Sequence, residues 1–538
     1  MKLTSWACAG LLLIAASCIG DLGAAEPRIG KFVKYDTGDF VIVTSRSSSQ
    51  AREIMENLAK FRLSLEKVLG KRAARSGIGT YIVIAGESDW TKYLQPREQL
   101  VGYFQRARFD NYMALNGDAG GYALYVMFHE YTHFYLSSRF SGEYPPWFNE
   151  GLAELMGYAK FKGTQTVLQI PMFRVQEARD RDWIPFDRMI KIDHSSREYQ
   201  SHKLADAFYA QAWLTVHYGL IEDTSFGKQI FTYLNQLNAL VPQEEASRTV
   251  FGADLEPING KLRSYARKSN MNSGAIELGA VPEIILPKAE PLSEVDGLAV
   301  LIDVMLATRL APARIRPLVE SMKRRAPDSA RSYILAARLA EYDDDSAAFE
   351  AAVTRAESLL AADDWLSQRQ LGSALLASAN DFNPTSTRTT KETDRDLKRA
   401  LKWYSKSVEK HNADAEALWG LGTVLTRLDR DLDVADMALR SAYEKVPASA
   451  SISVSLANLK GREQKPEEMI PYLQDTIRYA SDLSTRRWAT ETLEDTETYV
   501  AERKKADEEN RKQREEYEEK RAEYDKKYGK PKKKQGGG

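Results

Sequence analysis

The sequence predicts an α+β domain followed by an all-α domain built from helical repeats. In the first part, short β-branched segments at residues 39–44, 79–85 and 112–115 alternate with helical patterns. The helix predicted over residues 51–69 carries apolar side chains at helical spacing, so a sheet with helices packed on it is the economical interpretation. From about Ser293 the strand signal disappears, and Ala- and Leu-rich helical stretches follow.

Composition divides the 538 residues into five parts. Residues 270–274, with Pro282, Pro287 and Pro291, are typical of a linker. The predicted parts are a signal peptide (1–25), the α+β domain (30–268), the linker (269–292), the helical-repeat domain (293–495), and a charged helix with a disordered basic tail (496–538).

The N-terminus has the layout of a secretory signal. A lysine precedes an apolar run over residues 9–16, and small residues lead to a cleavage site near Ala25. The run is shorter than the ~20 residues that span a bilayer, which disfavours a retained anchor. Cys18 leaves a lipoprotein anchor open, although Ala15 stands where a lipoprotein signal usually has leucine. We therefore expect export to the periplasm or the medium.

Charge and cysteine content exclude several classes of site. The 75 Lys and Arg residues balance the 76 Asp and Glu residues, so no overall field favours nucleic acid or an anionic membrane as a partner. The two cysteines, Cys8 and Cys18, both lie in the segment that we expect to be removed. A disulfide framework and a thiolate metal site are thereby excluded, and any metal must be held by histidine and carboxylate.

Two windows of the C-terminal half repeat each other at an offset of 35 residues. The first window has Ala400, Tyr404 and Ser407, and the second has Ala435, Leu439 and Ala442. The small residues and Pro447, which closes the second window, resemble the tetratricopeptide repeat (TPR), whose paired helices pack closely. Such arrays bind proteins by default, so we expect a protein partner.

The charged tail predicts an exposed helix over residues 501–528. Glu508 and Lys512, like Glu516 and Lys520, have the spacing of helical ion pairs.

A metal-binding pattern occupies the apolar helix predicted over residues 122–136. His129 and His133 are four residues apart, so both imidazoles lie on one face and can reach one ion, while Glu130 points towards an open coordination position. A zinc site also needs a third protein ligand. The candidate is Glu150, 17 residues after His133, on a second helix that begins near Phe148.

These motifs resemble those of the peptidase MA-like gluzincins, zinc metallopeptidases related in chemistry to thermolysin and aminopeptidase N. The resemblance covers some 190 residues, from about Phe32 to Leu220. It rests on His129-Glu130-x-x-His133, on Asn149-Glu150-Gly151-Leu152-Ala153-Glu154, and on the helix with Tyr209-Ala-Gln-Ala-Trp213. It implies that residues 30–268 form a zincin-like (gluzincin) catalytic domain.

The resemblance also implies roles for single residues. Zn²⁺ would be bound by His129, His133 and Glu150, and Glu130 would be the general base that activates a water and passes its proton to the leaving amine. Glu154 would orient a ligand histidine from the second shell, although a solvated helix residue is the other interpretation. An extended peptide would pair with an edge strand, for which residues 112–115 are the candidate.

The donor that stabilises the oxyanion is not defined by the motifs. The candidates are Tyr209, His217, His202 and His194. We favour Tyr209 and expect His217, on an apolar helix, to be structural. We also expect Tyr131 and Phe134 to belong to the core.

Two functions remain open at this stage. The first is an exported zinc endopeptidase whose repeats dock substrates or partners. An aminopeptidase is disfavoured because we find no Gly-x-Met-Glu-Asn-type amine-binding motif upstream of the metal helix. The alternative is a non-catalytic TPR scaffold that carries a relic zinc-binding domain. Metal content alone cannot separate them, because a relic can keep its zinc.

Overall fold

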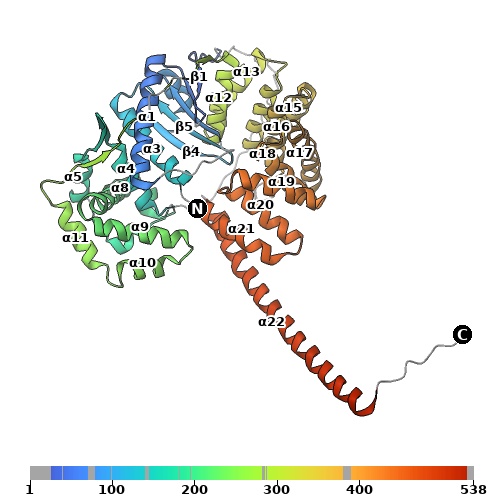
Figure 1. Cartoon of the computed structure of the whole chain (residues 1–538). Coiled ribbons are helices and arrows are strands. Elements are labelled where there is room, and N and C mark those ends of the chain that lie inside the picture. Colours follow the sequence, from blue (N-terminus) through green and yellow to red (C-terminus); the bar gives the residue numbers. More distant parts are fainter. Residues whose placement is uncertain are drawn as a thin grey trace, which may run out of the picture.

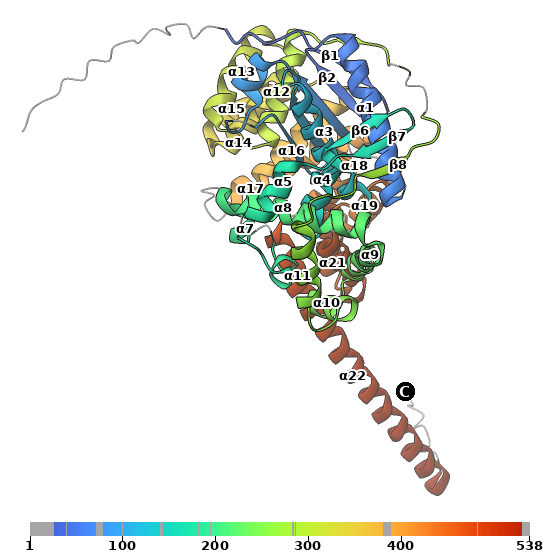
Figure 2. The same ribbon diagram turned by 90° about the vertical axis from the view of Figure 1, so that its left-hand side faces the viewer.

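The computed structural model describes residues 26–38, 40–70, 79–98, 100–139, 144–180, 182–193, 195–281, 285, 287–379, 389–480 and 482–529. An α+β part and a curved stack of paired helices lie side by side, and one long helix projects from the stack (Figures 1 and 2). The predicted signal peptide and the end of the basic tail, residues 530–538, lie outside the described residues. None of the helices formed by the described residues has both the length and the hydropathy of a membrane span.

The central sheet has six strands in the order β4-β5-β3-β2-β1-β9. They are β1 (Val33–Asp36), β2 (Val41–Thr44), β3 (Gly79–Ala85), β4 (Gly102–Arg106), β5 (Asp110–Asn116) and β9 (Glu290–Pro291). Strands β2, β3 and β5 are parallel, whereas β4 runs antiparallel to β5. The expectation that residues 112–115 form the edge is wrong, because β5 lies between β4 and β3. The two edge strands are β4 and β9, and β4 is the edge that lies against α3.

Helices cover both faces of this sheet (Figure 1). Ile82 and Met113 face α1 (Ser48–Leu69) and α3 (Gly121–Arg139), where Phe61 and Phe128 stack at 4.2 Å between ring centroids. The alternate residue Val83 faces α12 (Glu294–Ala307) and α13 (Pro312–Arg325). The first helix pair after the predicted boundary at residue 293 therefore completes the core of the sheet.

The segment predicted as a linker, residues 269–292, takes part in both sheets. Strand β8 (Gly274–Glu277) joins β6 (Ala159–Lys162) and β7 (Gln165–Leu168) in a second, three-stranded sheet. Strand β9 then pairs with β1, and the Lys34 ammonium lies 3.0 Å from the Glu290 carboxylate. Gly274 begins β8 and Pro291 ends β9, so parts of the predicted linker belong to the two sheets.

Shorter elements complete the α+β part. They are α2 (Glu87–Asp89), a π-helical turn (Trp90–Leu94), α4 (Pro146–Gly157), α5 (Met172–Asp180), α6 (Phe186–Met189), α7 (Arg197–Gln200), α8 (His202–His217), a second π-helical turn (Tyr218–Glu222), α9 (Thr224–Asn238), α10 (Gln243–Phe251) and α11 (Glu256–Ala266).

The C-terminal part is a helical-repeat array, as predicted. After α12 and α13 come the pairs α14 (Ala330–Tyr342) and α15 (Ser346–Leu359), α16 (Trp365–Ser378) and α17 (Thr390–Lys410), α18 (Ala415–Arg427) and α19 (Leu432–Lys445), and α20 (Ala450–Arg462) and α21 (Pro466–Tyr479). First helices begin at residues 294, 330, 365, 415 and 450, a spacing close to the ~34-residue tetratricopeptide period except between α16 and α18.

The last helix, α22 (Leu483–Tyr528), begins earlier than the predicted boundary at residue 496. Ala489, Thr496 and Val500 are buried, and the later residues are almost all exposed. The predicted helical ion pairs are present, with Lys512 2.9 Å from Glu508 and Lys520 3.4 Å from Glu516.

Gly420 allows neighbouring repeat helices to pack closely, and its substitution tests that packing. A Cβ atom at Gly420 would lie 2.1 Å from Cζ of the buried Tyr404, so Gly420→Ala should lower the free energy of unfolding by about 1–3 kcal/mol through overpacking. Gly461→Ala is the matched control, because its Cβ would meet only Met469 at 3.5 Å, an ordinary contact. Chemical denaturation of both variants checks this, and equal stability would contradict it.

Asp110, at the start of β5, makes stability depend on pH. Burial, reinforced by the Glu416 and Asp303 carboxylates, raises the pKa of Asp110 to about 7, against opposition from Arg369 and Arg338. The folded chain thus binds this proton more tightly than the unfolded chain, whose Asp pKa is ~3.9. The free energy of unfolding should therefore fall as pH rises from about 4 to about 7.

Asp110→Asn removes this titration and should flatten that pH dependence, by on the order of 1–2 kcal/mol after allowing for partial solvent exposure. Thermal unfolding midpoints of both proteins across this pH range measure the difference. Parallel curves would show that Asp110 has no raised pKa.

Candidate metal centre

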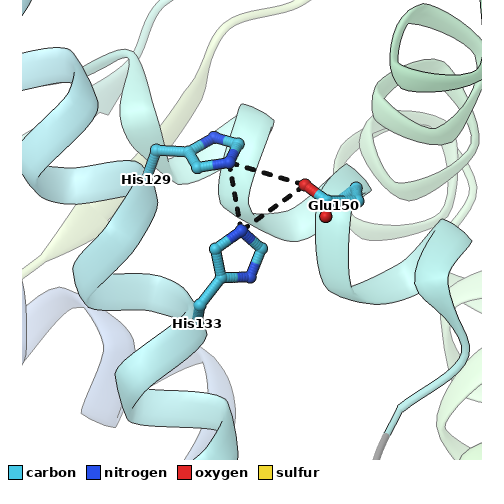
Figure 3. Close-up of side chains that lie close together, drawn as sticks. All are labelled: His129, His133 and Glu150. Carbon is cyan, nitrogen blue, oxygen red and sulfur yellow. Dashed lines mark hydrogen bonds and ion pairs between the residues drawn. The ribbon is translucent and has the colours of Figure 1, made fainter. Parts of the chain in front are cut away.

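Helices α3 and α4 bring three potential metal ligands together (Figure 3). His129 and His133 are one turn apart on α3, and Glu150 faces them from α4, which begins with Pro146 in its first turn. The Nε2 atoms of the two histidines are 3.1 Å apart, and Glu150 Oε2 lies 3.5 Å from His129 Nε2 and 3.4 Å from His133 Nε2. Among the described residues, this is the group of histidine and carboxylate side chains with donor atoms close enough to share one ion.

The donor triangle fits a zinc ion. Zinc ligands at ~2.0–2.1 Å in a tetrahedron lie about 3.3 Å from one another, which matches the three separations. Two imidazoles and one carboxylate are also a donor set that zinc prefers when one coordination position stays open for water. The side chains of His129 and His133 are 15% and 17% exposed, so solvent can reach the site. The predicted ligand set, His129, His133 and Glu150, is thus brought together.

Neighbouring polar groups orient two of these ligands. His133 Nδ1 lies 2.9 Å from Asn149 Oδ1, and when it donates its proton there, the lone pair of Nε2 is directed at the cluster. Glu150 Oε1 accepts a hydrogen bond of 2.8 Å from the Tyr199 hydroxyl, which leaves Oε2 for the cluster. Asn149 and Tyr199 were both missed as site residues in the sequence. Asn149 adjoins a ligand and could have been noted, whereas Tyr199 carries no local signal.

The cluster's electrostatics favour an ionised carboxylate. Burial alone would raise the pKa of Glu150, but the adjacent imidazoles outweigh it and hold that pKa well below its usual range. Burial likewise disfavours a charged imidazole at His133, yet the Glu150 carboxylate raises the pKa of His133 to about 9. A charged Glu150 is the form that a cation needs, and the proton that His133 holds in the ion-free site is released when a metal binds.

Glu154 lies beside His129, the ligand histidine nearest to it, but other side chains take up its hydrogen bonds. Its carboxylate accepts two hydrogen bonds from Arg174, of 3.0 and 2.7 Å, and one of 3.0 Å from the Tyr125 hydroxyl. Its Oε1 atom lies 3.9 Å from His129 Nδ1, which is longer than a hydrogen bond. Glu154 is buried, so it is not a solvated helix residue, and Arg174 fixes it next to His129.

Glu130 lies between the histidines and the open edge of the sheet. Its Oε2 atom accepts a hydrogen bond of 3.0 Å from the backbone N–H of Phe104 on β4. Burial raises the pKa of Glu130, while His129 and His133 lower it. Gly102 permits this arrangement, because a Cβ there would lie 2.6 Å from Val126 on α3. A carboxylate with a raised pKa beside the donor triangle is suited to moving a proton.

The candidate oxyanion donors fall into separate environments. Tyr209, on α8, lies near Glu150 and shares a side-chain hydrogen bond with Tyr199. Burial raises the pKa of both tyrosines, so both stay protonated. The Tyr199 proton is donated to Glu150, which leaves Tyr209 as the candidate donor to a substrate. His217 is buried with Nδ1 2.9 Å from the Tyr265 hydroxyl, as expected of a structural residue. His194 lies outside the described residues, and His202 begins α8.

Tyr131 and Phe134 are buried in the core between α3 and the sheet, as predicted.

Gly151, the residue after Glu150, lies where helices α4 and α8 approach each other closely. A Cβ at Gly151 would lie 2.4 Å from the carbonyl oxygen of Ala212 on α8. The close packing of α4 against α8 therefore requires a glycine at this position. This packing also brings Tyr209 of α8 near Glu150 of α4.

Comparisons with known proteins identify no protein with a similar metal site. No family model matches the chain, and a search of curated proteins found no match. Among solved structures, YrrB, a TPR protein with an unusual peptide-binding site, is 15% identical, with a TM-score of 0.27 over 37% of this chain and 92% of that one.

Two further solved structures are similar to a comparable degree. Yeast Tom70 is 14% identical, with a TM-score of 0.29 over 61% of this chain and 70% of that one. The Cut9–Hcn1 heterotetramer of the APC/C is 12% identical, with a TM-score of 0.22 over 70% and 75% of the two chains. TM-scores this low give no information about function.

Proposed function

We propose that this chain is an exported zinc metallopeptidase that cleaves peptide bonds within a polypeptide. The observation that carries the proposal is the triangle of His129, His133 and Glu150 donor atoms, 3.1–3.5 Å apart, with Glu130 beside it. The sequence spacing and the geometry agree, and both support one metal site with a general base. Export rests on the signal-like residues 1–25.

Zinc held at this site would polarise the substrate carbonyl and make a bound water more acidic. His133, oriented by Asn149, and Glu150, oriented by Tyr199, hold the ligand positions. Glu130 takes a proton from the attacking water and passes it to the leaving amine, which its raised pKa and its place beside the ligands support. Tyr209, next to Tyr199, is the proposed donor to the substrate oxygen as negative charge develops.

The edge strand β4 supports a peptide as substrate. Ala107 N–H donates to Asp110 and Asn116 N–H donates to Val101, so in this antiparallel register the backbone groups of Gly102, Phe104 and Arg106 face away from β5. The Phe104 N–H is taken by Glu130, so an extended peptide could pair with the remaining groups of that edge. An edge that continues past the site on both sides suits an endopeptidase.

A second candidate function is supported by the repeat array. The stacked helix pairs form a binding surface, so the chain could act as a non-catalytic scaffold with a relic zinc domain. Identification of new protein termini across a proteome, with wild type against Glu130→Gln, separates the two. Termini that appear only with wild type support the peptidase, and identical sets of termini support the scaffold.

A further inference from the structure

The hairpin formed by β4 and β5 is anchored in the concave side of the repeat array. Phe109, in the turn of the hairpin, lies 5.4 Å from the Trp419 ring of α18, and the Arg108 guanidinium lies 4.6 Å from the centre of that ring. The Trp419 indole N–H donates to the Ser451 carbonyl of α20 at 3.0 Å and to the Ser455 hydroxyl at 2.9 Å. The end of the edge strand is therefore fixed against two repeats.

A cleft of about 1120 Å³ opens where this hairpin meets the repeats. It is lined mainly by α16, α18 and α20, the first helices of successive pairs, together with α21, the start of α22 and the end of β4. Figure 1 shows the end of β4 beside these helices. Such a volume accommodates several residues of an extended chain, whereas a small-molecule pocket holds ~300–1,000 Å³.

The lining is strongly basic. Its arginines are Arg106, Arg108, Arg309, Arg427 and Arg462, against one carboxylate, Asp482. The Asp482 carboxylate already accepts hydrogen bonds of 2.7 Å from the Ser484 hydroxyl and the Thr485 N–H at the start of α22. Within the described part of the chain, Arg108, Arg309 and Arg462 make no ion pair with a carboxylate. Because the whole chain is nearly neutral, this concentration of positive charge is local.

The cleft continues the open edge of the sheet. Arg106 lies two residues beyond Phe104, the residue that donates to Glu130, and two residues of a strand span about 7 Å. A polypeptide paired with β4 at the metal centre would thus run directly into the arginine-lined cleft. Strand pairing requires a peptide backbone, which favours a polypeptide over a nucleic acid as the occupant.

From this continuity we infer that the arginine-lined cleft binds an extended, acidic segment of the substrate polypeptide while a neighbouring segment lies along β4. The inference rests on the proposed function and adds a substrate class to it. Aspartate and glutamate side chains would pair with the arginines, and the strand edge would hold the backbone. The chain's own end, residues 530–538, is basic and does not fit this site.

Binding can be measured separately from cleavage. The full chain carrying Glu130→Gln is titrated into fluorescently labelled peptides of equal length, which are acidic, neutral or lysine-rich, with anisotropy as the readout. The acidic peptide should bind at least about tenfold more tightly than the others, and its affinity should fall as salt is raised. Equal affinities, or no binding of any peptide, would overturn the inference.

Arginine substitutions locate the binding to the cleft. Arg309→Gln combined with Arg462→Gln should weaken binding of the acidic peptide about tenfold, because both are exposed charges that face it. Arg430→Gln is the matched control, since Arg430 follows α18, is 58% exposed and does not line the cleft. Equal loss in the control, or tighter binding of a single-stranded oligonucleotide than of the acidic peptide, would contradict the assignment.

Measuring peptide binding and peptide hydrolysis side by side tests acidic-segment binding in the arginine-lined cleft and the peptidase activity separately. Selective peptide binding without any hydrolysis by wild type would support the cleft and contradict the peptidase. Hydrolysis with no preference for acidic segments would support the peptidase and contradict the cleft. If both hold, the double arginine variant should raise KM for an acidic substrate and leave kcat unchanged.

Discussion

Glu130→Gln is expected to lower kcat/KM for peptide hydrolysis by at least about a thousandfold while the protein keeps its zinc. The amide matches the shape of the carboxylate and can still accept the Phe104 N–H, but it cannot take a proton from water or return one to the leaving amine. The loss therefore falls on the chemical step, and kcat should carry it.

Initial rates with a quenched fluorescent peptide library, together with zinc content, check this expectation. Glu66→Gln is a matched control, because Glu66 is a partly buried glutamate on α1 that pairs with Arg62 at 3.0 Å. Hydrolysis by the Glu130 variant at the rate of the control would remove Glu130 from the mechanism. Hydrolysis by neither variant nor wild type would favour the scaffold.

Glu150→Gln is expected to weaken zinc binding by more than about a hundredfold. The substitution keeps the volume of the side chain but removes the charge that lies 3.4–3.5 Å from the two imidazole nitrogens. Asn149→Ala should have a smaller effect, about 10–100-fold, because Asn149 orients His133 without being a ligand. A larger loss of zinc affinity in the Glu150 variant than in the Asn149 variant distinguishes a metal ligand from a residue that orients one.

Competition with a zinc chelator at constant pH measures both affinities. Glu177→Gln serves as the control, since Glu177 contacts Arg174 at 2.8 Å, and no contact of its carboxylate with a predicted ligand is described. An unchanged zinc affinity in the Glu150 variant would place the ion elsewhere. A fall of equal size in the Glu177 variant would point to general destabilisation instead.

The sequence was sufficient for features that depend on local spacing. Residues four apart on a helix share a face, so the pairing of His129 and His133 followed from the motif alone. The contribution of Glu150 was predictable because Asn149-Glu150-Gly151 stands at a workable distance on a second helix. Periodic small residues likewise indicated the repeat array before any contact between helices was known.

Features that depend on distant parts of the chain were not predictable. Strand β4, with the sequence Gly-Tyr-Phe-Gln-Arg, lacks the apolar alternation that marks a strand, so the edge was assigned to β5 instead. Tyr199 reaches Glu150 only because α7 and α8 fold back over α4. The use of α12 to cover the sheet follows from packing between residues some 200 positions apart, such as Val83 and Leu298.

X-ray absorption at the zinc edge of the purified full chain shows whether these three side chains hold the ion. We expect one zinc per chain, bound by two imidazole nitrogens and by oxygen atoms at about 2.0–2.2 Å, with a shell that changes in Glu150→Gln. A chain that takes up no zinc, or a coordination shell that is the same in wild type and in the Glu150 variant, would contradict it.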